Sequence, residues 1–510
     1  MPQDNSSNNK RIAKNTILLY IRMLLSVVVS LYTSRVVLQT LGVEDYGIYG
    51  VVGGVVGMFS FLNASMSGAT SRFLTYEMGK QGDGRLNETF STAMIIHVLI
   101  AIGVFVIAES FGLWFLCNKL VIPVDRMLAA HVVYQFSIIS MFFTVTQTPY
   151  NAIIIAHEKM DVYAYVELLN VFLKLGIVYI LLIGNWDKLI LYASLTLIVS
   201  IMIALIYRVY CLKHYEESQF HFIWDKDILR PMLNFSGWDL YGNMSVVFYT
   251  QGITMLLNMF FGPVLNAANN ISSTVQGTIK GFAYNVIQAF RPQIIKQYAQ
   301  GNIDAVNQYC IMATQYTLIL YSLIAVPIYI KAEYILDLWL GVVPDHTVAF
   351  LRIVLVGTVF NLANNIVNIP IHACGRMKLF SMLTGSCFLI SIPLMYVMLK
   401  LGASADTSYF IVLLSYFSCL ICSLFMLKQN VPDFSLRHLI SIGYIKISVC
   451  VVIGVAFSYA MDLLACNDLS AFLLMAIVNT VSLVICMLTV VMNKSDRTKL
   501  YTYISNKIKI

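Results

Sequence analysis

Charged residues are scarce in this sequence of 510 residues. Lys and Arg together number 33 and Asp and Glu number 26, which is 12% of the chain, whereas 59% is apolar. Soluble globular proteins carry about a quarter charged residues, and one core cannot hold so many apolar side chains. The composition therefore predicts a chain that lies in a lipid bilayer. Long unbroken apolar runs favour spanning helices over a barrel, whose strands would alternate apolar and polar residues.

Motifs of nucleotide-dependent and metal-dependent enzymes are also lacking. The sequence has no G-x-x-x-x-G-K-[ST] loop and no dehydrogenase glycine loop, and His157-Glu158 lacks the second His of a zinc protease pair. Cys419-x-x-Cys422 lies among Leu and Ile, which is typical of small packing residues. We therefore expect no catalytic residue, no metal site and no cofactor. The net charge of +7 indicates basic cytoplasmic loops rather than a nucleic acid partner.

Apolar stretches of about 20 residues predict fourteen transmembrane helices. They lie near residues 17–39, 47–71, 89–113, 129–155, 162–183, 189–210, 232–257, 266–290, 308–330, 348–372, 379–399, 407–427, 442–463 and 470–492. The first follows a polar leader and lacks a small-residue cleavage site, so we expect a signal anchor. The predicted fold class is all-α, a polytopic integral membrane protein.

The basic residues predict the orientation of these helices. Of the 33 Lys and Arg, 22 fall in the termini and loops of one side, 5 fall in the opposite loops and 6 lie inside spans. Because cytoplasmic loops carry the excess of Lys and Arg, both termini are expected to be cytoplasmic. The longest connection has about 20 residues, which leaves no room for a soluble catalytic domain.

The chain also contains an internal repeat, with an offset near 219 residues. Asn15 matches Asn234, Leu41-Gly42 matches Phe261-Gly262, and Arg72 matches Arg291. This predicts that helices 1 to 6 are repeated as helices 7 to 12, in two lobes of the same orientation that face a central cleft. The expected domains are an N-terminal lobe at 1–211, a cytoplasmic linker at 212–231, a C-terminal lobe at 232–430, and two extra helices with a cytoplasmic tail at 431–510.

Two lysines are expected near the middle of the membrane. Lys174 and Lys280 lie about 12 and 14 residues into their predicted helices. A lysine at this depth costs roughly 2.5 to 3.5 kcal/mol, which water, a counter-ion or a ligand must offset. Since each lobe supplies one, an anion held between the lobes is a natural partner. Lys174 has an alternative partner in Glu167, on the same face of its helix.

Polar rows at helical spacing extend this predicted site. Such rows mark helix faces that avoid lipid, either as a water-filled cleft or as hydrogen-bonding contacts between helices. The predicted substrate-binding residues are Lys174, Lys280, Arg22, Asn361, Asn365 and Gln276. Asp239 and Glu167 are candidates for ion coupling, with a pairing between Asp239 and Arg22 as the alternative. Gly50 and Gly54 predict either close helix packing or a hinge.

Four segments carry a resemblance to a known family. They are Asn15-Thr-Ile-Leu-Leu-Tyr-Ile-Arg22, Ser34-Arg35-Val-Val-Leu, Leu41-Gly-Val-Glu-Asp-Tyr-Gly-Ile-Tyr49 and Ala156-His-Glu-Lys-Met160. They resemble the polysaccharide-transporter branch of the multidrug/oligosaccharidyl-lipid/polysaccharide (MOP) exporter superfamily. The resemblance implies a bacterial inner-membrane flippase of the O-antigen or capsule type, which moves an undecaprenyl-diphosphate-linked oligosaccharide by alternating access. The fourteen-helix count is also similar to that of lipid II flippases.

The partners implied are the lipid-linked oligosaccharide, membrane lipids and other glycan-assembly proteins, and the chain is expected to be a monomer. Two other functions stay open at this point. A MOP-type multidrug or cation antiporter would need an acidic cleft. A polysaccharide-modifying membrane enzyme would need a larger outer loop than 331–347, or a His/Asp/Arg cluster on that side.

Overall fold

The computed structural model describes residues 5–79, 85–157, 159–183, 186–223, 225–374, 377–464, 468–491 and 497. For some of these residues the structure describes the backbone and not the side chain: 5–24, 79, 160, 234–236, 238–239, 292, 377 and 464. The described chain consists of helices and connections and contains no strand, which confirms the all-α fold class.

The first half of the chain contains helices joined by short connections. They are α1 (Asn5–Gly57), α2 (Ser60–Gly79), α3 (Leu86–Ile107), α4 (Leu113–Asn118), α5 (Met127–Ala156), α6 (Met160–Leu181), α7 (Lys188–His214) and α8 (Lys226–Phe261). A π-helical segment, Ala108–Gly112, joins α3 to α4 without a break, so these elements form one long helix.

The second half continues in the same way. Its helices are α9 (Pro263–Ala299), α10 (Ile303–Ile330), α11 (Ala332–Leu340), α12 (Thr347–Ala373), α13 (Met377–Lys400), α14 (Ala405–Asn430), α15 (Leu436–His438), α16 (Lys446–Leu464) and α17 (Asp468–Cys486). A π-helical segment at Leu439–Ile445 joins α15 to α16, and another follows α17 at Met487–Val491.

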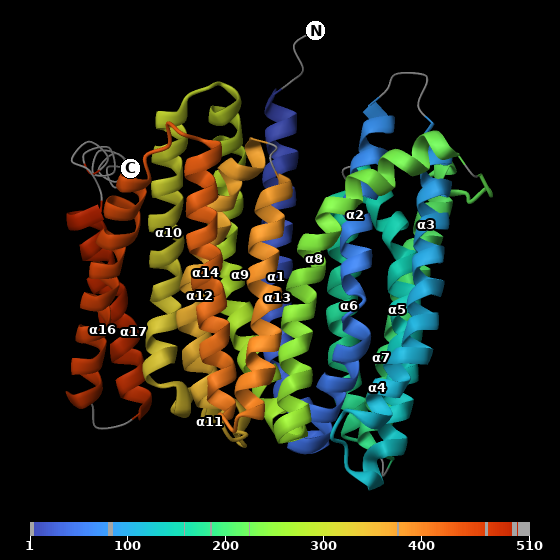
Figure 1. The fold of residues 1–510 in the computed structure, drawn as a ribbon, viewed down its shortest axis with the longest axis horizontal. Coiled ribbons are helices and arrows are strands. Elements are labelled where there is room, and N and C mark those ends of the chain that lie inside the picture. The colour runs from blue at the N-terminus through green and yellow to red at the C-terminus, as the bar shows by residue number, and fades with distance from the viewer. Residues whose placement is uncertain are drawn as a thin grey trace. The chain divides into compact units, whose positions relative to one another are not determined.

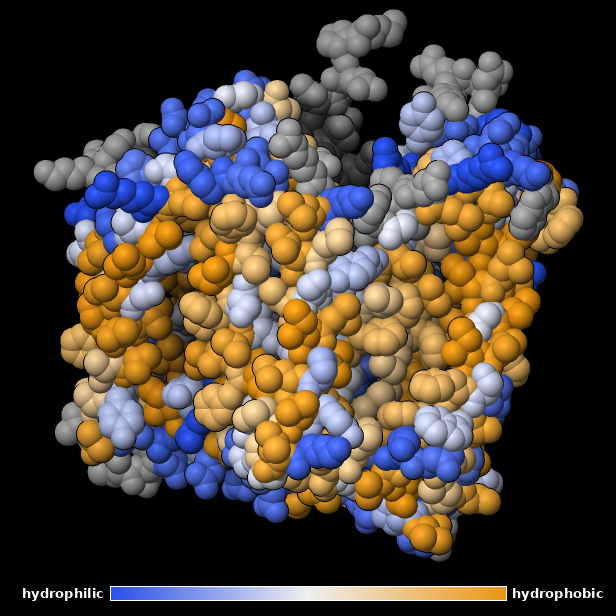
Figure 2. All heavy atoms as spheres, in the orientation of Figure 1, coloured by the Kyte–Doolittle hydropathy of each residue, from blue (hydrophilic) through white to orange (hydrophobic). Residues whose placement is uncertain are grey.

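Twelve helices of the described chain are long and apolar enough to cross a membrane. All fourteen predicted segments overlap helices of the structure. The count of spanning helices is twelve rather than fourteen because the predicted segments 47–71 and 266–290 are not counted as separate spans. The first is divided by a turn between α1 and α2, and the second lies in α9, which carries Asn269, Asn270, Gln276 and Lys280. On the face shown in Figure 2, hydrophobic residues cover the middle of the helices and hydrophilic residues gather toward their ends. The protein is a multi-pass membrane protein.

The chain forms two compact units by its internal contacts. Unit 1 contains Met1–Ile271 and Phe388–Ala405, and unit 2 contains Ser272–Cys387 and Asp406–Ile510. The predicted domain division at 212–231 stays a prediction.

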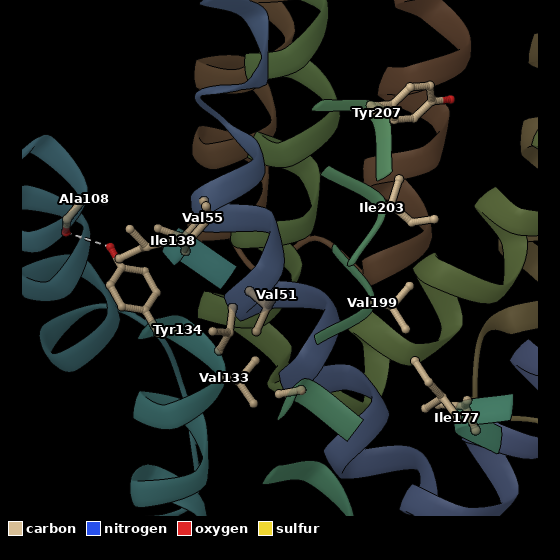
Figure 3. Close-up of a cluster of buried hydrophobic side chains, with 14 of the residues drawn as sticks. Val51, Val55, Ala108, Val133, Tyr134, Ile138, Ile177, Val199, Ile203 and Tyr207 are labelled. Carbon is tan, nitrogen blue, oxygen red and sulfur yellow. Dashed lines mark hydrogen bonds between the residues drawn. The ribbon is translucent and has the colours of Figure 1, made fainter. Parts of the chain in front are cut away.

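The core of unit 1 lies between α1, α5, α6 and α7, which Figure 3 shows. Its buried side chains include Val51, Val55, Val133, Tyr134, Ile138, Ile177, Val199, Ile203 and Tyr207. The Tyr134 hydroxyl donates a 2.7 Å hydrogen bond to the carbonyl of Ala108, where the π-helical segment begins. Burial of one such side chain is worth about 1.5–3 kcal/mol, so packing between these helices stabilises the unit.

Two glycines mark equivalent bends in the two halves of the repeat. Gly42 has φ 82° inside α1, and Gly262 has φ 81° between α8 and α9. Residues with a Cβ rarely adopt positive φ at this extended ψ, so both positions require glycine. The repeat predicted from Leu41-Gly42 and Phe261-Gly262 therefore has the same backbone conformation at both sites.

In unit 2, α16 and α17 run side by side next to α10 (Figure 1). The Asn479 amide donates to the carbonyl of Ser322 at 3.1 Å, which ties α17 to α10. Lys331 forms 2.7 Å ion pairs with Asp462 and Asp468, at the connection between α16 and α17. These two helices are the predicted pair without a repeat partner, and polar contacts as well as apolar packing hold them.

The connection between α7 and α8 is held against the start of α3. The Asn87 amide donates to the carbonyls of Glu217 at 3.0 Å and Gln219 at 2.7 Å. Asp225 accepts from the Asp227 backbone N–H at 2.7 Å and pairs with Arg85. The Asp227 N–H and the Arg85 guanidinium lower the pKa of the Asp225 carboxyl, because both stabilise its charged form.

Candidate functional site

Lys280 lies near the centre of α9, 17 residues after Pro263 and 19 before Ala299. Its side chain is half-buried, and it forms no ion pair or hydrogen bond with any residue that the structure describes. At 1.5 Å per residue it is about 26 Å from the nearer end of the helix. A lysine at this depth requires water or an anion to offset its desolvation.

Gln276 and Asn361 lie on the helices around this lysine. The Gln276 amide donates a 2.9 Å hydrogen bond to the Thr358 hydroxyl of α12, which itself donates to the Val354 carbonyl at 2.7 Å. The Ser272 hydroxyl also donates to α12, at the Thr347 carbonyl. These two contacts show that α9 and α12 run in the same direction. Lys280 follows Gln276 by about one turn of α9, and Asn361 follows Thr358 by about one turn of α12.

The polar row of α12 includes amides whose hydrogen bonds are incomplete. The Asn365 amide donates to the carbonyl of Asn361 at 2.8 Å and to its side-chain oxygen at 3.1 Å. The side-chain oxygens of Asn364 and Asn368 are buried and have no hydrogen-bond partner within the described chain. An unpaired buried polar atom is costly, so this row has hydrogen-bonding capacity that the described residues do not satisfy.

Lys174 has a different environment from Lys280. It lies in α6, 7 residues before Leu181, and its side chain is exposed. It forms no ion pair with Glu167 or with any other described residue, and Glu167 accepts a 3.5 Å hydrogen bond from the Tyr207 hydroxyl of α7. The local pair that the spacing suggested is therefore not formed, which leaves Lys174 available to another anion.

Two other predicted residues lie outside the described side chains. Arg22 is in α1 and Asp239 is in α8, and the structure places only their backbone. Their suggested pairing and the coupling role of Asp239 stay predictions.

A small cavity of about 270 Å³ lies inside unit 1, along the polar row of α5. Ser137, Ser140 and Thr144 line it, together with Gly53 and Gly57 of α1. The Ser137 and Thr144 hydroxyls donate to backbone carbonyls one turn earlier, as hydroxyls in membrane helices commonly do. Three hydroxyls of the row thus line this cavity.

Gly50 and Gly54, on the same helix, have a packing role. A Cβ at Gly50 would lie 1.9 Å from the Asn270 amide nitrogen, and one at Gly54 would lie 2.8 Å from the Gln251 side-chain oxygen. Both distances are too short for real contacts, so the structure favours close helix packing at these glycines.

Sequence reasoning missed Glu109, a carboxylate inside the long helix made by α3 and α4. Glu109 lies in the π-helical segment, 9 residues before the end of α4 at Asn118. The predicted helix ends at residue 113, which would place Glu109 within about one turn of the helix end. Gln135 donates to one of its oxygens at 3.2 Å, and the other oxygen is buried without a partner among the described residues. The signal that the helix continues was the apolar sequence after residue 112, which includes Leu113, Phe115 and Leu116.

Solved transporters share this helical fold. Lipid II flippase MurJ in an inward closed conformation has a TM-score of 0.71, is 16% identical, and the match covers 93% of this chain and 98% of that one. An inward-facing multidrug resistance MATE transporter has a TM-score of 0.67 at 13% identity, with 82% and 100% covered. A MOP superfamily transporter from Pyrococcus furiosus has a TM-score of 0.53 at 14% identity, with 82% and 96% covered. This chain therefore has the fold of the MOP superfamily transporters.

The sequence identifies the family within this fold class. The family model described as polysaccharide biosynthesis protein matches residues 10–288, which is more than half of the chain. The protein belongs to this polysaccharide biosynthesis family, as its opening motifs indicated. Among curated proteins, no sequence matches it.

Proposed function

We propose that this protein is a flippase that translocates an undecaprenyl-diphosphate-linked oligosaccharide across the bacterial inner membrane for surface polysaccharide biosynthesis. The family and the fold support this proposal. The observation that carries it is Lys280, a half-buried cation in the middle of a long helix and without an acidic partner in the described chain.

The chemistry of the substrate explains why a flippase needs this cation. A diphosphate linker carries about two negative charges, which cannot enter hydrocarbon unpaired. Lys280 would pair with one of them at the depth of crossing, and Lys174 and Arg22 would supply charge from the N-terminal lobe. Gln276, Asn361 and Asn365 would donate hydrogen bonds to phosphate or sugar oxygens. None of these roles requires a catalytic group, and we propose transport without bond cleavage.

The same proposal includes the arrangement in the membrane. The lobes at 1–211 and 232–430 would alternate access around the cleft, with the linker at 212–231 and both termini in the cytoplasm. The helices at 431–510 would contact the lipid tail, and the chain would act as a monomer beside other glycan-assembly proteins. Asp239 or Glu167 would couple transport to an ion.

Complementation tests the proposal. In a strain that lacks its own flippase but still makes lipid-linked oligosaccharide, the protein should restore surface glycan and remove the intermediate that accumulates in the inner leaflet. The control is the same strain with an unrelated multi-pass protein at equal abundance. The test is repeated in several flippase-null strains, each of which makes a different lipid-linked oligosaccharide. If the oligosaccharide is made in all of them but stays in the inner leaflet, the protein is not a flippase of this class.

One observation favours the alternative of a multidrug or cation antiporter. Glu109 has a buried oxygen with no hydrogen-bond partner in the described part of the chain, as expected of a group that binds a proton or cation. An antiporter would extrude a lipophilic cation from energised cells and would lose this activity in Glu109→Gln. The flippase proposal predicts no such efflux.

A further inference from the structure

A largely apolar groove lies on unit 1, and Thr146 and Gln147 are uncharged polar side chains in its lining. A cavity of about 470 Å³ lies between α3, α5 and α7, and a second of about 350 Å³ follows it between α3 and α5. Phe142 of α5 lines both cavities, so the two adjoin at this residue and together make up the groove. Leu99, Ile102 and Phe105 form its wall on α3 and are between 43% and 53% exposed.

The groove has the length of one lipid leaflet. On α3 its lining runs from Met94 to Phe105, and on α5 from Ile139 to Tyr150, which is 11 residues in each case. At 1.5 Å per residue this is about 17 Å, close to half of the roughly 30 Å hydrocarbon core. A chain that spans one leaflet would therefore fill it from end to end.

The two ends of the groove differ in charge. Arg208 lines the larger cavity, and no charged residue lines the smaller cavity. Arg208 of α7 lines the larger cavity beside the Tyr150 hydroxyl, and it has no acidic partner within the described chain. It is 6 residues before His214, about 9 Å from the end of the helix, which is the depth at which arginine reaches the headgroups. The smaller cavity is lined by apolar residues alone.

Aromatic residues cover the polar end. Phe220 and Phe222, from the connection before α8, line the larger cavity. This segment is held in place because the His221 backbone N–H donates to the Ser91 hydroxyl at 3.1 Å and Asn87 binds the carbonyls of Glu217 and Gln219. Aromatic side chains are favoured at the headgroup level, so the groove has an apolar body and an aromatic, cationic mouth.

We propose that this groove is a binding site for one anionic phospholipid. Its phosphate pairs with Arg208, and one acyl chain lies along Leu99, Ile102 and Phe142. The charge selects the occupant, because a single guanidinium balances the single net charge of phosphatidylglycerol, whereas a diphosphate would need a second cation. The predicted topology places the lipid in the cytoplasmic leaflet, and none of the proposed transport residues lines the groove.

Native mass spectrometry of the purified full-length protein tests this site. Phosphatidylglycerol should be retained in preference to phosphatidylethanolamine. Arg208→Gln should reduce its retention about fivefold, the worth of one basic residue near an anionic headgroup, and Arg208→Lys should restore most of it. The matched control is Lys213→Gln, which removes the same charge from an exposed residue of the same helix that does not line the cavity.

A second pair of variants tests the groove itself. Leu99→Trp should fill it and reduce retention, whereas Val106→Trp, on an exposed residue of α3 outside the lining, should not. Equal retention in Arg208→Gln and Lys213→Gln, or equal retention of the two phospholipids, would overturn the proposal. So would displacement of phosphatidylglycerol by undecaprenyl phosphate at equal concentration, since the occupant would then be the carrier lipid.

Discussion

Replacing Lys280 by methionine should make the protein more stable and less active at the same time. A lysine at the centre of a spanning helix costs about 2.5 to 3.5 kcal/mol. Because Lys280 is half-buried and has no ion pair in the described chain, part of this cost remains in the resting protein. Methionine keeps the length of the side chain and removes its charge, so we expect a gain of about 1–2 kcal/mol in the free energy of unfolding.

The expected loss of export is larger than this gain in stability. A hydrogen bond to a charged group contributes about 1.5–3 kcal/mol, which corresponds to roughly a 10- to 100-fold lower rate if it is made while the diphosphate crosses. Lys280→Arg should retain partial activity, because it keeps the charge but changes the shape of the donor group. Lys280→Ala should lose most activity without gaining stability, since it also removes packing.

The assay combines surface glycan in a flippase-null strain with thermal unfolding of the purified protein. Each variant is compared at matched membrane abundance. Lys296→Met is the matched control, because Lys296 is an exposed lysine in the last turn of the same helix. It should leave both measurements unchanged. A normal amount of surface glycan with Lys280→Met would refute the proposal of an anion site at Lys280. An equal loss of glycan in Lys280→Met and Lys296→Met would show that the position of Lys280 in the middle of the helix is not what matters.

Three other predictions test the arrangement of the chain. A reporter active only in the periplasm should be active when fused at Ser404 and silent when fused after the last residue; activity at the C-terminus would mean an odd number of spans. Truncation after Val431 removes the two extra helices and should leave the two predicted lobes inserted, by protease mapping, but impair export of long-tailed substrates; export at the full rate would exclude a role for the two removed helices in tail binding. Tyr134→Phe removes the buried hydrogen bond to Ala108 and should lower the free energy of unfolding by about 1 kcal/mol; an unchanged thermal unfolding profile would contradict this.

Hydropathy located the helices well because the bilayer imposes a simple requirement. Every backbone polar group must be paired internally, so a long apolar run can only form a helix. The repeat was visible for a similarly local reason, since Gly42 and Gly262 both adopt a positive φ that favours glycine. These features depend on a residue and its neighbours along the chain, and the sequence contains that information directly.

Features that depend on packing between helices could not be predicted in this way. The spacing of Glu167 and Lys174 suggested an ion pair, but Tyr207 of another helix binds Glu167 instead. Glu109 lies deeper than its predicted helix end implied, because the π-helical segment carries α3 onward into α4. The groove that ends at Arg208 combines three helices and a connection, which no single periodicity reveals.

The predicted span at 266–290 contains Lys280, and α9, which holds this span, is not among the twelve described helices that are apolar enough to cross a membrane. A helix can be less apolar than lipid requires only when part of its surface avoids lipid, so low hydropathy in a helix of full length marks a face turned toward protein or water. Near the start of α9, Asn270 lies against Gly50 of α1, a contact too close for any larger residue. Further along α9 lies Lys280. A helix of full length that is too polar to count as spanning, as α9 is, is therefore where a polar substrate path should be sought first.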